Sequence, residues 1–117
     1  MIIRIDPASS TPIFEQLVRA VRAEALAGRL AAGDRLPAAR ELAASLEVNV
    51  HTVLHAYQSL RDEGFVELRR GRGAIVTGAA AELAAVRRHA VDLVEAARER
   101  GITADAVLAL VREELAR

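Results

Sequence analysis

The first part of the chain alternates apolar and polar residues with the period of a helix. From Thr11 to Gly28 the apolar side chains recur three and four residues apart, and Pro12 suits the first helical position. Gly28 offers a left-handed end for this helix, and Leu30 follows closely enough to fold back onto the last turn. Turn-forming residues then lead to a short second helix at residues 38–46.

A third helix, at residues 50–63, is predicted after a break of three residues. Asn49 is a suitable N-cap whose side chain accepts from an amide near Thr52, and Gly64 ends the helix. The stripe that faces the core is spaced i, i+3, i+4, i+7 and consists of Val53, Ala56, Tyr57 and Leu60. The opposite face, which we expect to be exposed, consists of Val50, His51, Leu54, His55, Gln58 and Arg61.

Two short apolar runs, at residues 65–69 and 74–77, predict a β-hairpin. Glycines allow positive φ in the turn between them, which consists of Arg70, Gly71, Arg72 and Gly73. Residues 3–6 also alternate, which predicts a short edge strand that pairs with a later segment. Three helices followed by a hairpin form a winged helix-turn-helix, so we expect a mainly α chain with a small β-hairpin whose tip is the wing.

Beyond Gly78 the chain becomes rich in alanine, glutamate and arginine, and two more helices are predicted. The first has a coiled-coil-like seam of Leu83, Val86, Ala90, Leu93 and Ala97. Gly101 ends it, and Thr103 caps a last helix. The apolar side of that helix consists of Val107, Leu108, Val111 and Leu115. A two-helix hairpin cannot bury such stripes alone, so we divide the chain into a domain at residues 1–78 and a dimerisation tail at residues 79–117.

Composition limits the classes of protein to which the chain can belong. An apolar fraction of 52% with 27% charged residues is typical of a soluble globular protein and argues against a disordered segment. Cysteine is absent, which excludes disulfides, thiolate metal sites and thiol nucleophiles. No apolar run approaches the roughly 20 residues that cross a bilayer, and no signal sequence is visible. We therefore expect a cytoplasmic protein without a membrane partner.

The formal net charge is zero, so binding to a polyanion has to rest on local charge. All 16 basic residues are arginine, which binds a phosphate or a guanine edge bidentately, although a coding bias toward arginine explains the same count. The segment LRRGRGAIV, at residues 68–76, admits three interpretations: a phosphate-cradling loop, a solvated turn, or a hairpin tip that reaches a polyanion. It matches no GxGxxG or Walker motif, which argues against nucleotide binding.

No arrangement of residues suggests catalysis. Ser9 and Ser10 precede a helix without a frame of histidine and aspartate around them, and the carboxylates are scattered over helix faces. His51 and His55 have the spacing at which two imidazoles share a metal, but no third ligand accompanies them. We expect phosphate contact or simple exposure for this pair, exposure for His89, and neither enzymatic activity nor a cofactor nor a metal.

Five motifs stand in consistent order over residues 5–76. They are PIFEQL, GDRLPAAREL, the frame of Thr52, Ala56 and Tyr57, EGFVE, and RRGRG. Together they resemble the N-terminal domain of the GntR family of bacterial transcription regulators. The short tail is similar to the YtrA subfamily, in which two C-terminal helices mediate dimerisation. The resemblance implies a homodimer that represses by binding an inverted-repeat operator, with two winged helices about 34 Å apart. It implies no particular small-molecule effector.

Residue chemistry and the resemblance together place one set of side chains along duplex DNA. Arg40 matches a family arginine that contacts phosphate or guanine from the helix before the recognition helix. Arg70 or Arg72 reaches a neighbouring minor groove, and the wing glycines let the backbone approach phosphates. The candidate DNA contacts are Arg35, Arg40, Asn49, Val50, His51, Thr52, Leu54, His55, Arg70, Gly71 and Arg72.

Some positions depart from the family pattern. Glu47 stands where the family usually has glycine, so either a left-handed backbone there costs about 1 kcal/mol or the turn is reshaped. Ala38 replaces a serine cap worth about 1 kcal/mol. Val50 and Leu54 are apolar on the exposed face, and three interpretations are open: partial burial under the wing or against the stem of Arg61, contact with thymine methyls, or a protein partner.

The alternative function belongs to a different class. It is a winged-helix module that has lost DNA binding and binds another protein. The zero net charge of the chain and the apolar pair of Val50 and Leu54 are the observations that favour it. Steeply salt-dependent binding to DNA discriminates the two functions, because only phosphate contacts release counterions.

Overall fold

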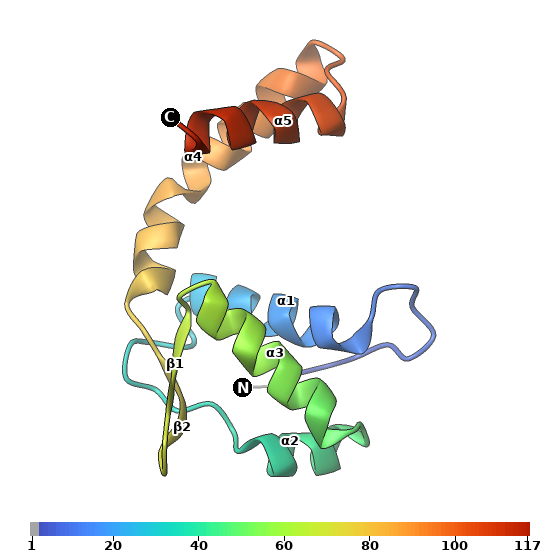
Figure 1. The fold of residues 1–117 in the computed structure, drawn as a ribbon. Coiled ribbons are helices and arrows are strands. Elements are labelled where there is room, and N and C mark those ends of the chain that lie inside the picture. Colours follow the sequence, from blue (N-terminus) through green and yellow to red (C-terminus); the bar gives the residue numbers. More distant parts are fainter. Residues whose placement is uncertain (1–2) are drawn as a thin grey trace. The chain divides into compact units, whose positions relative to one another are not determined.

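The computed structural model describes residues 3–117, and its contacts divide the chain into two units. The first unit ends at Leu83 and the second is Ala84–Arg117. In chain order the elements are α1 (Ile13–Leu26), α2 (Ala39–Leu46), α3 (Val50–Asp62), β1 (Val66–Arg69), β2 (Gly73–Val76), α4 (Ala79–Glu99) and α5 (Ala104–Leu115) (Figure 1). The first unit is a winged helix-turn-helix, as the sequence predicts.

Helix α3 lies at the centre of the first unit, where it packs on α1 and α2 and leads into β1 (Figure 1). The predicted core stripe is confirmed, because all four of its residues are buried: Val53, Ala56, Tyr57 and Leu60. Leu17 and Val21 of α1 and Leu42 of α2 complete this contact. The helical period of the apolar residues therefore determines which side of α3 faces the core.

The hairpin is antiparallel, with Val66 opposite Val76 and Arg69 opposite Gly73. Its inner face is apolar and buried at Val66, Ala74 and Val76, whereas β1 exposes its remaining residues. Gly71 and Gly73 both have positive φ, near 80°, in and after the turn. The predicted hairpin and the reason for its glycines are confirmed.

The predicted edge strand at residues 3–6 is wrong. These residues take no strand conformation, although Ile3 and Ile5 pack against the core. The side chain of Gln16 in α1 holds this segment instead: its Oε1 accepts from the backbone N–H of Asp6 at 2.7 Å, and its Nε2 donates to the Asp6 carbonyl at 3.0 Å. Side-chain bonds to a helix thus replace the ladder that a strand would form.

The segment that does pair with the hairpin is the linker between α1 and α2. Gly33 N–H donates to the Val76 carbonyl at 2.8 Å, and Val76 N–H donates to the Asp34 carbonyl at 2.8 Å. The Leu36 N–H bonds the Ala74 carbonyl at 2.9 Å, and Arg35 stands opposite Ile75 in an antiparallel bridge. Buried Leu36 anchors this linker, so the start of α2 is fixed against the wing.

The second unit consists of most of α4 and the whole of α5. Ile102 N–H donates to the Ala97 carbonyl at 2.9 Å where the chain reverses, and Thr103 caps α5 by accepting from Ala106 N–H at 3.2 Å. Both the predicted reversal and the Thr103 cap are confirmed. Within residues 3–117, no helix is long and apolar enough to cross a membrane.

Candidate nucleic-acid interface

The turn between α2 and α3 keeps a left-handed backbone in spite of its glutamate. Glu47 has φ 57° and ψ 44°. Val48 N–H donates to the Ala43 carbonyl at 3.0 Å and Glu47 N–H to the Ala44 carbonyl at 3.3 Å, which is the Schellman pattern at a helix end. The turn is therefore not reshaped, and the strain expected for a residue with a Cβ in this conformation is present.

Asn49 caps the N-terminus of α3, but with a different partner from the predicted one. Its Oδ1 accepts from His51 N–H at 2.8 Å, while Thr52 N–H bonds the backbone carbonyl of Asn49 at 3.0 Å. The side chain reaches only two residues forward because the backbone carbonyl already occupies the third amide. At the N-terminus of α2, Ala38 makes no side-chain cap bond, as its sequence requires.

The exposed face of α3 is the predicted one, except at its first residue. His51, Leu54, His55, Gln58 and Arg61 are exposed, whereas Val50 is half-buried and packs against the core. The apolar pair is thereby separated into two roles: Val50 supports the core, and Leu54 leaves 40% of its surface exposed.

Leu54 lies beside a shallow, mainly apolar hollow between α3 and the wing. The hollow has a volume of about 420 Å³ and is lined by Leu54 and Gln58 of α3, Leu68 of β1 and Arg70 of the turn, together with the residues at the start of α2. Leu54 is thus exposed at the edge of an open hollow, and its three interpretations stay predictions.

Two contacts orient α3 relative to its neighbours. The hydroxyl of Tyr57 donates to the carbonyl of Pro37 at 2.7 Å, which ties α3 to the residues just before α2. Burial raises the pKa of Tyr57 to about 12, so this hydroxyl stays a donor above pH 10 as well. On the other side, the imidazole of His55 stacks on the ring of Phe14 in α1.

The arginines fall into those with and those without a carboxylate partner. Arg22 pairs with Glu63, Arg61 with Asp62, and Arg69 with Glu67. By contrast, in the part of the chain that the structure describes, no carboxylate comes within 4.0 Å of any of the predicted arginines, which are Arg35, Arg40, Arg70 and Arg72. Their guanidinium groups are exposed and available to phosphates.

The structure places Leu54 of α3 and Arg70 of the wing on one hollow, whereas the candidates Arg35 and Arg72 line another. Asn49 is the N-cap of α3, and His51 and Thr52 lie in its first turn; Leu54 lies on the next turn beside the hollow that Arg70 also lines. Gln58 belongs to the same hollow but was not among the predicted contacts. Its position four residues after Leu54, on the exposed side of the helix, was the signal that could have identified it.

The two histidines of α3 belong to no cluster of three potential metal ligands among the described residues. Residues 3–117 contain no group of three histidine, aspartate or glutamate side chains that could hold an ion. His55 stacks on Phe14 of α1.

Helix α3 is a recognition helix with an exposed polar face and a capped N-terminus. Unpaired arginines lie on the helix before it and on the wing. These features define the class of protein as a winged-helix DNA-binding domain. Comparison with known proteins gives the family. Residues 13–76, more than half of the chain, match the family of bacterial regulatory proteins called GntR, and the chain belongs to this family.

Individual relatives agree with this assignment. The chain is 45% identical over 75 residues to the HTH-type transcriptional repressor YtrA of Bacillus subtilis; the match covers 64% of this chain and 58% of that repressor. Its fold is similar to that of YtrA from Sulfolobus acidocaldarius, a GntR-family transcription factor, with 37% identity, a TM-score of 0.62, and coverage of 79% and 99% of the two chains.

A third similarity extends into the tail. A GntR family transcriptional regulator from Listeria monocytogenes is 29% identical, with a TM-score of 0.64 over 93% of this chain and 98% of that one. The resemblance to GntR regulators of the YtrA kind is thus confirmed, and these relatives are transcription regulators.

Proposed function

We propose that this chain is a sequence-specific transcriptional repressor that acts in the cytoplasm and binds an inverted-repeat operator as a homodimer. The observation that carries the proposal is that Arg40 of α2 and Arg70 of the wing are exposed and have no carboxylate partner among the described residues. Arg40 stands at the start of α2, and Arg70 lines the same hollow as Leu54. Helix α3 enters the major groove, and these two arginines bind the phosphates or groove edges on either side.

The residues of α3 differ in how deeply they reach into the major groove. His51 and Thr52, in the first turn, contact phosphates or base edges, because the N-terminal residues of a recognition helix reach deepest. The cap bond of Asn49 uses only its Oδ1, so its side-chain NH₂ can still donate to a phosphate. His55 supports the orientation of α3 through its stack on Phe14, and Val50 does so through the core.

Dimerisation through the tail is supported by apolar surface that the second unit leaves uncovered. Val86 and Leu108 are each 52% exposed, Leu115 is 80% exposed, and α5 buries none of its residues. Ala97 is the exception among the predicted seam residues, because it is buried where α4 leads into α5. A second copy of the tail would cover these side chains, and their removal from water would stabilise the dimer.

The test of the proposal is selection of bound sequences from fragmented bacterial DNA by the full chain, followed by fluorescence anisotropy on the selected duplex. We expect an inverted repeat and an affinity that falls steeply with salt. Sedimentation should give a dimer for the wild type and a monomer for Leu108→Arg. Enrichment of no sequence, or salt-independent binding, would reject the repressor function.

One observation favours the alternative of a protein-interaction module: the mainly apolar hollow beside Leu54. In that case the selection yields no enriched sequence, and Arg40→Gln and Arg70→Gln leave the behaviour of the chain toward DNA unchanged. Specific binding that is lost in both variants decides for the repressor.

A further inference from the structure

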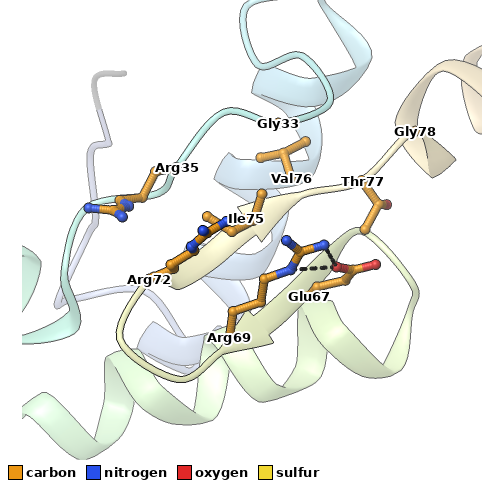
Figure 2. A pocket seen from close by; sticks show the side chains of 9 residues that line it. All are labelled: Gly33, Arg35, Glu67, Arg69, Arg72, Ile75, Val76, Thr77 and Gly78. Carbon is orange, nitrogen blue, oxygen red and sulfur yellow. Dashed lines mark hydrogen bonds and ion pairs between the residues drawn. The ribbon is translucent and has the colours of Figure 1, made fainter.

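The two arginines of the wing turn lie on opposite sides of the hairpin. Arg70 lines the hollow beside Leu54 and α3, whereas Arg72 lines a second hollow of about 570 Å³ on the outer face of the wing. Figure 2 shows this outer face, with Arg72 alongside Ile75 and Arg35 on the neighbouring segment. From the sequence, either of the two turn arginines could reach the minor groove, but in the fold they lie on different surfaces.

Strand alternation and a backbone bridge build the outer face. Val66, Ala74 and Val76 point into the core, so Glu67 and Ile75 point outward. Arg35 reaches the same face because the linker between α1 and α2 pairs with β2, which sets Arg35 opposite Ile75. We call Arg35, Arg69 and Arg72, which line this hollow together, the outer wing cluster.

The outer wing cluster carries an excess of positive charge. The Oε2 of Glu67 accepts from Nε of Arg69 at 3.0 Å and from a terminal nitrogen of Arg69 at 2.7 Å, so this pair is close to neutral (Figure 2). For Arg35 and Arg72, no carboxylate of the described residues lies within 4.0 Å. Two free guanidinium groups beside an open hollow form a surface that fits phosphate oxygens.

We propose that the outer wing cluster binds backbone phosphates of the duplex beyond the segment that α3 contacts. This inference rests on the proposed function. Arg35 and Arg72 lie on the side of the hairpin that faces away from the core, so they do not share the hollow that joins Arg70 to α3. A duplex that continues past the wing presents its next phosphates to them. Arg70 then serves the operator itself, while Arg35 and Arg72 extend the bound length of DNA.

Glu67 limits the strength of this outer contact. Its carboxylate occupies the guanidinium of Arg69 and repels phosphates that enter the same hollow. Replacing it with glutamine removes the negative charge and frees Arg69 to bind a phosphate. Glu67→Gln therefore tightens binding to flanked DNA, whereas loss of Arg35 and Arg72 weakens it.

The experiment compares two duplexes that carry the selected operator, one ending at its edges and one extended by about 10 base pairs, roughly a helical turn, on each side. Anisotropy is measured over a range of salt concentrations. For the wild type, log Kd against log salt is steeper on the extended duplex, by about 0.9 for each added phosphate contact. Arg35→Gln/Arg72→Gln removes that difference, and Glu67→Gln enlarges it.

The matched control is Arg87→Gln/Arg112→Gln, which removes two tail arginines that also lack a carboxylate partner among the described residues. It has the same net charge as the wing variant and should keep the wild-type difference between duplexes. Melting curves verify that the variants, all at exposed positions, fold like the wild type.

Three results would overturn the inference. An equal flank effect in the wild type and in Arg35→Gln/Arg72→Gln would show that the cluster does not contact flanking phosphates. Calorimetric binding of inorganic pyrophosphate that the wing variant abolishes, without any flank effect, would assign the cluster to a small phosphorylated ligand. Absence of specific binding to either duplex would reject the proposed function, and this inference with it.

Discussion

The imidazole of His55 stacks on the phenyl ring of Phe14, with ring centroids 4.2 Å apart and planes 18° from parallel. This contact joins the recognition helix α3 to the first turn of α1. The spacing of polar residues placed His55 among the candidate DNA contacts. The stack gives His55 a structural role as well, because it holds α3 in one orientation about its axis against α1. Such an aromatic pair contributes about 1 kcal/mol beyond its buried area.

We expect His55→Phe to keep both the stability and the operator affinity of the wild type, because phenylalanine stacks as well as histidine. His55→Ala should lower the free energy of unfolding by about 1 kcal/mol. Urea denaturation and anisotropy measure the two quantities on the same samples. A loss of affinity in His55→Phe at unchanged stability would show instead that the imidazole hydrogen-bonds DNA.

Glu47 is the one residue with a Cβ that adopts positive φ in the described chain. Glu47→Gly should raise the free energy of unfolding by about 1 kcal/mol, because glycine adopts this conformation without a steric penalty. Thermal and urea unfolding measure the gain. Glu47→Ala is the control: it removes the carboxylate but keeps the strain, so a comparable gain in that variant would attribute the effect to charge.

The pH dependence of stability above neutrality should report on Tyr57. Its folded-state pKa of about 12 is above the unfolded value of 10.0, because burial disfavours the phenolate. The protonated hydroxyl thus stabilises the fold fully below pH 10, and this contribution is lost as the pH rises from 10 toward 12. The chain has one tyrosine and neither lysine nor cysteine, so few other groups titrate there.

The variant Tyr57→Phe provides the comparison. It loses the hydrogen bond to the Pro37 carbonyl, so its free energy of unfolding at neutral pH should fall by about 1 kcal/mol. Its stability should also decline less than that of the wild type between pH 10 and 12. Parallel declines in the two proteins would mean that another group controls unfolding in alkali.

Leu54 should make the operator sensitive to thymine methyl groups. Its exposed part is apolar, and it lies between His51 and Gln58 on the face of α3 that we propose enters the groove. Burial of one methyl contributes about 0.8 kcal/mol, or about a fourfold change in Kd. Replacing thymine with uracil at each operator position in turn should therefore weaken the wild type about fourfold at one position or more.

The control for this prediction is Leu54→Ala, which should lose the response to uracil at the same position. If every position responds equally in both proteins, Leu54 reads no methyl group. Its role is then limited to lining the hollow between α3 and the wing.

The local pattern determined most of the fold. The helical stripe from Val53 to Leu60 identified the buried side of α3, and the glycines of the wing marked a turn that needs positive φ. These features are encoded within a few residues, because helix faces and hairpin turns depend on spacing and on backbone freedom. The arginines at positions 35, 40, 70 and 72 were candidate contacts for the same reason, since residue type and motif suffice to name them.

Only the tertiary structure decided what pairs with what. Alternation at residues 3–6 looked like a strand, yet residues 33–36 took the place along β2, because buried Leu36 anchors that linker while Gln16 holds the N-terminal segment elsewhere. The same pairing sets Arg35 opposite Ile75 and turns Arg72 away from Arg70. Such contacts join residues far apart in the chain, and their choice depends on competition between packing arrangements that no local period records.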